Sequence, residues 1–412
     1  MKNFTSAEKI QVGLNFGAGV IPLGRLASHE SKIYFEYDKN FLKSGFELSP
    51  LRLPLKPGPS SFDYYLFEGL PGIFNDSLPD GWGRLLFDRY LRSLGVLPAN
   101  VSALDRLAHV GHHGMGALVY EPDHSQVEEG DVLSLDMIAE QAQEVLDGRS
   151  EDVIQMLLEL NGSSAGARPK ALIGVDRDRK NISHGVNNLP DSYEPWLVKF
   201  ANTNDGEDAG AIEYVYALMA KEAGINMPDI HLFPAKHGAG YFAIRRFDRD
   251  GQKRFHMHTA CGLLHSDFRA PSLDYEDLIA LTSMLTKDIR EVEKMFRLAV
   301  FNVMAHNRDD HAKNFSYLMN EEGQWKLSPA YDLTFSSGPR MQQSTTVMGE
   351  GKNPSTEHLK RLGQEAGLSS SQIVAITEQT KEALAGWTLK AKEYGVSEIN
   401  IDLIGKKITE HN

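Results

Sequence analysis

The first part of the chain contains short apolar and aromatic runs separated by glycine and proline, a pattern typical of β-strands joined by tight turns. On this pattern, residues 32–37 and 117–120 are predicted strands. Residues 80–83 open a stretch whose apolar positions have helical spacing, and Ser134 is placed to cap a later helix. We therefore expect a β-rich N-terminal part that also contains a helix.

The middle of the chain mixes the two periodicities. Residues 170–175, 196–200 and 241–247 are predicted strands, and residues 212–223 are a predicted helix that ends at Gly224. Strands and a single helix in this order predict an antiparallel sheet crossed by a helix, which is an α+β arrangement.

From about residue 274 onward the apolar positions recur at helical spacing, as Val292, Phe296 and Val303 illustrate. The whole pattern predicts a two-lobed α+β fold with an N-terminal β-rich subdomain and an all-helical C-terminal lobe. The expected units are residues 1–125, a nucleotide-binding lobe at 126–255 and a helical catalytic lobe at 256–412.

Composition narrows the class of protein. The 412 residues are 41% hydrophobic and 24% charged, which is ordinary for a globular protein, and the formal net charge is -13. An acidic chain is poorly suited to bind DNA on its own. The single cysteine, Cys261, fits a reducing compartment, and neither a run of about eighteen apolar residues nor an apolar signal segment is found. We therefore expect a cytoplasmic protein with no membrane span.

Residues 161–170 are rich in glycine, serine and alanine and end in Lys170. Small side chains allow backbone amides to approach phosphate oxygens, so this loop is a candidate phosphate-binding loop. It lacks the Gly-Lys-Ser/Thr ending of a Walker A motif. A flexible surface turn would have the same composition.

Lys199 lies in an apolar strand pattern, and Glu213 comes near the start of the next predicted helix. A strand lysine paired with a helix glutamate is the arrangement by which kinases orient the α- and β-phosphates of ATP. A lysine on the exposed face of a strand and a glutamate in a first helical turn also occur without such a function.

In residues 307–314, Asp309 is followed five positions later by Asn314. Kinases use this interval to place a catalytic aspartate and a metal-binding asparagine on one loop. Asp332 follows the predicted strand 325–327 and is a candidate second metal ligand. Carboxylate and amide oxygens are the ligands that Mg²⁺ prefers.

Two other clusters could in principle hold a metal. One comprises His306, Asp309, Asp310 and His311, but its reading as a hydrolase site leaves Asn314 without a role. The second cluster comprises His256, His258, Cys261 and His265, whose spacing matches no closed zinc pattern. Surface or core histidines are the simpler interpretation of the second cluster.

Together the motifs resemble those of the HipA family of serine/threonine kinases, over about residues 10–390. Residues 75–83 and 111–117 resemble the N-terminal region of that family. Residues 162–170 resemble its phosphate loop, and residues 309–316 with Tyr331 and Asp332 resemble its catalytic and metal-binding segments.

The resemblance implies a distant protein-kinase-like fold that uses ATP and Mg²⁺. It implies Asp309 as the catalytic base, Asn314 and Asp332 as metal ligands, Lys199 on the phosphates, and Ser163 as an autophosphorylated serine. Residues implied to border the nucleotide are Ala165, Gly166, Ala167, Arg168, Pro169, Lys170, Arg245, Arg246, Phe247, His311, Ala312, Lys313, Asn314, Tyr331 and Asp332. Some family members carry glutamate at the position of Arg245, so a side-chain role there is open.

Family members act as toxins restrained by a helix-turn-helix antitoxin that binds operator DNA, and some phosphorylate an aminoacyl-tRNA synthetase. The resemblance implies the same partners here, with DNA contacted mainly through the antitoxin. Two alternatives stay open: a small-molecule kinase with the same Asp-to-Asn spacing, and a catalytically silent module that binds an antitoxin.

Overall fold

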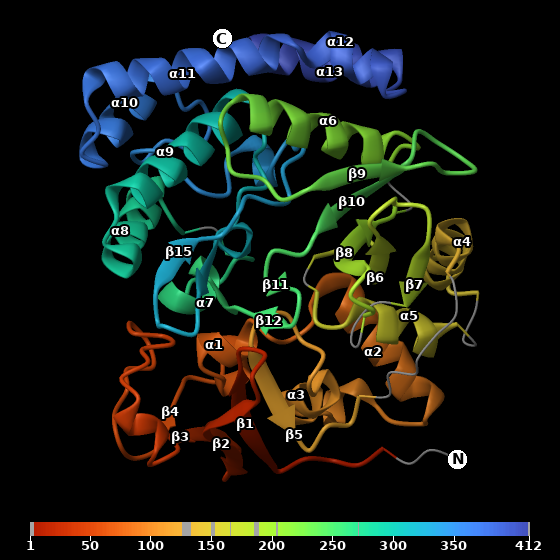
Figure 1. Ribbon diagram of the computed structural model, residues 1–412, viewed down its shortest axis with the longest axis vertical. Helices are drawn as coiled ribbons and strands as arrows, with labels where there is room; N and C mark the ends of the chain where they lie inside the picture. The colour runs from red at the N-terminus through yellow and green to blue at the C-terminus, as the bar shows by residue number, and fades with distance from the viewer. Residues whose placement is uncertain are drawn as a thin grey trace.

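The computed structural model describes residues 4–125, 133–149, 153–164, 166–184, 189–202, 205–270 and 272–410. Its N-terminal part lies at the bottom of Figure 1, and its C-terminal helices run across the top. Between these two regions lie a second sheet and further helices, among them α8 and α9. The predicted α+β fold is therefore confirmed.

The N-terminal part is built on an antiparallel sheet with the strand order β4-β3-β2-β1-β5. The predicted strands at 32–37 and 117–120 correspond to β3 and β5, and the helix predicted to open at residues 80–83 is α2. The elements of this part are β1 (Lys9–Asn15), β2 (Val20–His29), β3 (Lys32–Tyr37), η1 (Phe41–Lys43), β4 (Ser60–Ser61), η2 (Phe67–Gly69), α1 (Gly72–Asn75), α2 (Gly81–Ser93), η3 (Pro98–Asn100), α3 (Ala103–Val110) and β5 (Leu118–Glu121).

The second sheet is antiparallel with the order β7-β6-β8-β10-β9. The predicted strands at 170–175, 196–200 and 241–247 correspond to β6, β8 and β10. The predicted helix at 212–223 lies within α6, and the helix capped by Ser134 is α4. The elements are α4 (Leu135–Leu146), α5 (Ile154–Asn161), β6 (Lys170–Asp176), β7 (Ile182–His184), β8 (Tyr193–Lys199), α6 (Ala209–Glu222), β9 (Ile230–Phe233) and β10 (Tyr241–Arg245).

The two faces of this sheet pack against different helices, and this fixes the direction of Lys199. On β8, Trp196 and Val198 belong to a core formed with α2, α4 and α5. The alternate residue Leu197 packs in a smaller cluster with Ala217 of α6. Because side chains alternate along a strand, Lys199 points to the same side as Leu197. The helix α2 of the N-terminal part thus covers one face of the second sheet, and α6 lies on the other.

The C-terminal part is mainly helical, as predicted, but it is not all-helical. It contains an antiparallel sheet with the order β13-β14-β15. Residues 256–259 pair with residues 316–319, which in turn pair with residues 325–327. The elements are β11 (Arg249–Asp250), β12 (Lys253–Arg254), β13 (His256–Thr259), α7 (Ala260–Leu264), α8 (Tyr275–Thr286), α9 (Ile289–Met304), η4 (Ala312–Asn314), β14 (Ser316–Met319), β15 (Trp325–Leu327), η5 (Pro339–Met341), α10 (Thr356–Glu365), α11 (Ser370–Ala385), α12 (Trp387–Glu393) and α13 (Glu398–Thr409).

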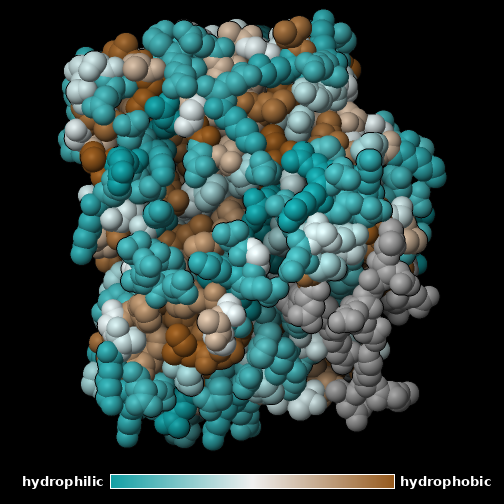
Figure 2. All heavy atoms as spheres, viewed as in Figure 1, coloured by the Kyte–Doolittle hydropathy of each residue, from teal (hydrophilic) through white to brown (hydrophobic). Residues whose placement is uncertain are grey.

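The surface seen in Figure 2 is dominated by hydrophilic residues, with apolar surface collected in a compact patch over the N-terminal part and in bands higher up. Among the described residues, no helix has both the length and the apolar character needed to cross a bilayer.

Candidate functional site

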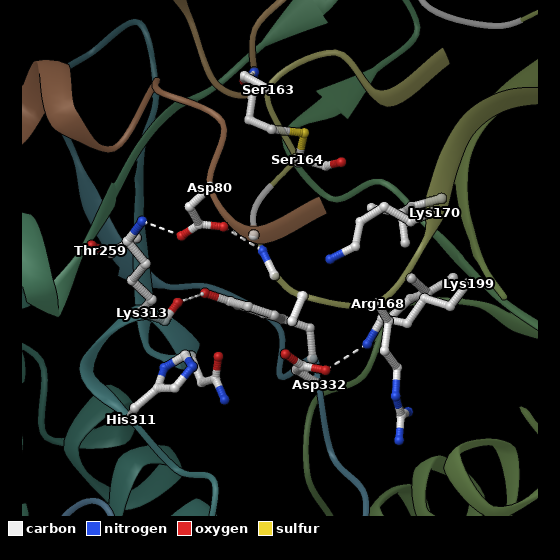
Figure 3. Close-up of a pocket in the computed structure, with 18 of the residues that line it drawn as sticks. Asp80, Ser163, Ser164, Arg168, Lys170, Lys199, Thr259, His311, Lys313 and Asp332 are labelled. Atoms are coloured by element: carbon white, nitrogen blue, oxygen red, sulfur yellow. Dashed lines mark hydrogen bonds and ion pairs between the residues drawn. The ribbon is translucent and has the colours of Figure 1, made fainter. Parts of the chain in front are cut away.

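A cleft of about 570 Å³ opens where the second sheet, the N-terminal part and the segment after α9 meet. Most of the residues singled out from the sequence line it (Figure 3). Pro169 and Ala312 are buried beside the cleft without lining it, and Ala165 lies outside the described residues. The predicted residues that line it are Ser163, Gly166, Ala167, Arg168, Lys170, Lys199, Glu213, Arg245, Arg246, Phe247, Asp309, His311, Lys313, Asn314, Tyr331 and Asp332.

Lys199 joins two carboxylates at the centre of this cleft. Its Nζ lies 2.5 Å from Oε1 of Glu213 on α6 and 2.5 Å from Oδ1 of Asp332. Burial alone would raise the pKa of the Asp332 carboxyl, but the charges of Lys199 and Lys170 outweigh it and lower that pKa. Burial likewise opposes the charge of Lys199, and Asp332 and Glu213 outweigh it to raise the lysine pKa. Lys199 and Asp332 are therefore both ionised at neutral pH.

Two more cations lie beside this group. Lys170 on β6 is directly opposite Lys199 on β8 in the strand register. Burial lowers the pKa of Lys170 to about 8, and the positive charge of Lys199 acts in the same direction. Arg168 forms ion pairs with Asp205 at 2.9 Å and with Glu213 at 3.3 Å. Three cations thus lie below the glycine-rich loop, and two of them, Lys199 and Arg168, are held by carboxylates. Such side chains can donate charge-assisted hydrogen bonds to phosphate oxygens.

Asp309 and Asn314 lie on the segment after α9, and both line the cleft. The Asn314 Nδ2 donates a hydrogen bond of 2.7 Å to the main-chain carbonyl of Asp309. This contact engages the amide nitrogen, and the amide oxygen is the atom suited to a hard metal ion. Burial raises the pKa of Asp309, and the nearby His311 opposes that increase.

The neighbouring residues of this segment point away from the cleft. Asp310 is fully buried and accepts hydrogen bonds from the Tyr275 hydroxyl at 2.7 Å and from the Ser344 amide at 2.9 Å. Arg308 donates to the main-chain carbonyls of Met341 and Lys352. These contacts fasten residues 341–352 to the back of the segment.

Arg245, Arg246 and Phe247, which the resemblance implied to border the nucleotide, also line the cleft, and we call them the hinge edge. Arg245 forms an ion pair with Glu194 at 3.3 Å, so this arginine has a partner on the adjacent strand β8. The Arg246 guanidinium forms a buried pair with Asp248 at 2.7 Å, and its amide donates to the Pro195 carbonyl. Arg246 therefore holds the backbone of this edge in place.

The cluster of His256, His258, Cys261 and His265, considered above as a metal site, contains histidines with a structural role. His256 lies 3.1 Å from the Leu48 carbonyl, and His258 lies 2.6 Å from an Asp76 oxygen. His265 accepts a hydrogen bond from the Gly72 amide. These histidines join the N-terminal part to the C-terminal part. Within the described ranges, no group of three or more His, Cys, Asp or Glu side chains is arranged to hold a metal ion.

One cleft residue, Asp80, was not predicted. It precedes α2 in the N-terminal part, and its carboxylate accepts a hydrogen bond from the Gly166 amide and forms an ion pair with Lys313. The sequence signal was present in residues 75–83, which resemble the family's N-terminal region, but it did not indicate a place in the cleft.

A two-lobed α+β fold with a lysine–glutamate pair that also contacts an aspartate in a cleft defines a kinase-like class of protein. The model of the HipA-like C-terminal domain matches residues 162–387, more than half of the chain, and that of the HipA N-terminal domain matches residues 18–121. The chain belongs to the HipA family, and membership of a family of kinases implies the use of ATP.

Individual relatives are distant. The serine/threonine-protein kinase toxin HipA of Shewanella oneidensis is 25% identical over 352 residues, which are 78% of this chain and 74% of the relative. A solved complex of HipA, HipB and operator DNA from the Shewanella oneidensis MR-1 toxin antitoxin system matches with a TM-score of 0.69 at 18% identity. The match covers 97% of this chain and 95% of that chain, and it shows a shared fold.

Proposed function

We propose that the protein is an ATP- and Mg²⁺-dependent serine/threonine protein kinase. The observation that carries the proposal is the contact of Lys199 with both Glu213 and Asp332, in the same cleft that Asp309 and Asn314 line. Phosphoryl transfer depends on positioning and on charge stabilisation, and this arrangement supplies both from fixed side chains.

In this proposal Asp309 accepts the proton of the attacking serine or threonine hydroxyl. Its raised pKa makes it a stronger base than an exposed aspartate. Lys199 and Lys170 bind phosphate oxygens beneath the glycine-rich loop. The hinge edge at Arg245, Arg246 and Phe247 borders the adenine.

The residues present fit a magnesium ion. Asp332 is kept ionised by its lysine neighbours, and Asn314 contributes an amide oxygen on the facing segment. These are hard oxygen donors of the kind that Mg²⁺ requires, with phosphates and waters able to complete six ligands. When bound, the metal would neutralise charge on the transferred phosphoryl group.

We also propose Ser163 as a site of autophosphorylation. Its Oγ accepts a hydrogen bond of 2.8 Å from the Met115 amide, and only 2% of the residue is exposed. A phosphate cannot occupy that position, so the modified loop must leave it. Its displacement would remove part of the phosphate site, and phosphorylation would therefore inactivate the enzyme.

The proposed cellular role is that of a toxin restrained by a helix-turn-helix antitoxin, with an aminoacyl-tRNA synthetase as a candidate substrate. The name of the Shewanella relative and the content of the solved complex support the toxin role and an antitoxin partner, and the synthetase is carried over from the family resemblance alone. The net charge of -13 agrees with DNA being contacted mainly through the antitoxin.

The test is incubation of the purified chain with labelled ATP, with Mg²⁺ or with excess chelator, followed by identification of phosphorylated residues. We expect metal-dependent phosphoserine at Ser163 in wild type, and no label in Asp309→Asn. Ser163→Ala separates modification of the loop from transfer to added protein. Equal labelling of wild type and Asp309→Asn would refute the proposal. Growth arrest on expression of wild type, but not of Asp309→Asn, tests the toxin role.

A further inference from the structure

Asp80 occupies the N-cap position of α2, yet its side chain does not cap that helix. Aspartate at this position ordinarily accepts hydrogen bonds from the first amides of its own helix, which stabilises the helix end. Here the side chain lines the cleft, with only 9% of the residue exposed (Figure 3). The Asp80 carboxylate therefore makes no capping hydrogen bond to α2 and instead contacts residues outside this helix.

Those contacts reach two different parts of the kinase site. Oδ1 accepts a hydrogen bond of 2.5 Å from the amide of Gly166, in the glycine-rich loop 162–170. Oδ2 pairs with the Nζ of Lys313, in the segment that carries Asp309 and Asn314. One carboxylate of the N-terminal part therefore connects the phosphate loop with the catalytic segment.

The first turn of α2 is fitted against the loop, so the position of Asp80 is fixed. The Trp82 amide donates to the Gly166 carbonyl at 3.0 Å. Gly81 has a φ of +46°, and a Cβ on it would lie 2.4 Å from that same carbonyl oxygen. Only glycine permits this approach. Both main-chain polar groups of Gly166 are thus bound by residues 80–82.

The N-terminal part is also anchored on the other side of Asp80. Asp76 accepts hydrogen bonds of 2.7 Å from both the amide and the hydroxyl of Thr259. The segment that carries Asp80 is therefore also attached to the C-terminal part, through Asp76.

Lys313 depends on this carboxylate. Its side chain is 8% exposed, and its Nζ lies 4.7 Å from the ring centre of Phe268. A buried cation that loses its counterion must be neutralised or must move toward solvent. Burial by itself would raise the pKa of Asp80, but the charge of Lys313 and the hydrogen bonds from Lys313 and the Gly166 amide outweigh it and lower that pKa.

We propose that Asp80 is a positioning residue of the kinase site, holding the phosphate loop and Lys313 at a fixed separation across the nucleotide cleft. The inference rests on the proposed kinase function. It makes the N-terminal part a structural component of the phosphoryl-transfer site, in addition to any surface that it offers to a partner.

The test compares Asp80→Ala, Asp80→Asn and Lys313→Met in the full-length chain, measuring kcat, KM for ATP and thermal unfolding. We expect Asp80→Ala to lower kcat by about 100-fold, because small displacements of catalytic groups cost this much. Asp80→Asn keeps an acceptor for the Gly166 amide and loses the ion pair, so its loss should be intermediate. The double variant Asp80→Ala with Lys313→Met should be no worse than the more impaired single variant.

Asp105→Asn is the matched control. Asp105 is a buried aspartate of the same N-terminal part that accepts hydrogen bonds from the Ala7 amide and the Ser102 hydroxyl, away from the cleft. It should lower the unfolding temperature and leave kcat unchanged. Wild-type kcat and KM in Asp80→Ala, or independent effects of Asp80 and Lys313, would overturn the inference.

Calorimetry with ATP and Mg²⁺ separates this inference from the proposed function. If the wild type binds ATP but transfers no phosphate, the kinase proposal fails. Weaker ATP binding by Asp80→Asn than by Asp105→Asn would then still support Asp80 as a positioning residue, whereas equal binding would overturn that role too. If Asp80→Ala does not fold, Asp80→Asn and Lys313→Met carry the comparison.

Discussion

The front and the back of the segment 307–314 differ in what they contact, although their residues are immediate neighbours. Asp309 and His311 line the cleft, whereas Arg308 and Asp310 face the protein interior. Asp309 and Asp310 have the same side chain and are adjacent in the chain. Burial raises the pKa of both carboxyls, and for Asp310 the value is about 7.

The difference lies in the partners. Asp310 accepts hydrogen bonds from the Tyr275 hydroxyl and from the amides of Ser344 and Thr345, which fix its position completely. Asp309 faces the cleft, where a substrate hydroxyl can approach. Alternate residues of an extended segment point to opposite sides. The segment therefore combines a reactive face with an anchoring face, and substitutions on the two faces should affect different measurements.

The largest expected effect separates the two aspartates directly. Asp309→Asn should lower kcat by about 1,000-fold, because the proton acceptor for the attacking hydroxyl is lost. Its unfolding temperature should not fall, since the substitution removes a partly buried charge. Asp310→Asn is the control, with most of the activity retained. Steady-state phosphotransfer and thermal unfolding check both, and equal losses of kcat would show that the two faces are not separate.

The next effect extends the comparison across the cleft. Lys199→Met should lower kcat by about 100-fold, because a fixed charge near the transferred phosphate is removed. Without Lys199, the pKa of Asp332 should rise, since its main stabilising charge is gone. Lys236→Met, at an exposed lysine paired with Glu140 on the same lobe, is the control. Similar kinetics for the two variants would remove Lys199 from the reactive face.

The sequence predicted the elements and residues whose signal is local. The strands at 32–37 and 170–175 and the helix at 212–223 follow from apolar periodicity, and the structure confirms them. Lys199, Asp309 and Asp332 were selected by their local sequence context and by the family resemblance, and the fold brings them to one cleft. Their chemical roles remain predictions that the variants above test.

Contacts between distant segments could not be predicted in this way. Asp80 and Lys313 are 233 positions apart, and nothing near either residue indicates the other. The short strand β13 pairs with β14 about sixty positions later, and its four residues are too few to give a clear strand pattern on their own. The contact of Asp80 with Lys313 depends on how the N-terminal part packs against the C-terminal part, which is a property of the whole fold.

The smallest expected effect concerns stability at the anchoring face. The folded-state pKa of Asp310 is about 7, above the value of about 3.9 for an unfolded chain. The protonated carboxyl therefore stabilises the fold at acidic pH, and this contribution is lost as the pH rises through about 7. Between about pH 5.5 and about pH 8 the loss amounts to about 2 kcal/mol of unfolding free energy. Asp310→Asn cannot ionise, so denaturant unfolding of this variant should show a correspondingly smaller decrease over that range. A decrease equal to that of wild type would mean that Asp310 is already ionised at pH 5.5, held as a carboxylate by the amides of Ser344 and Thr345.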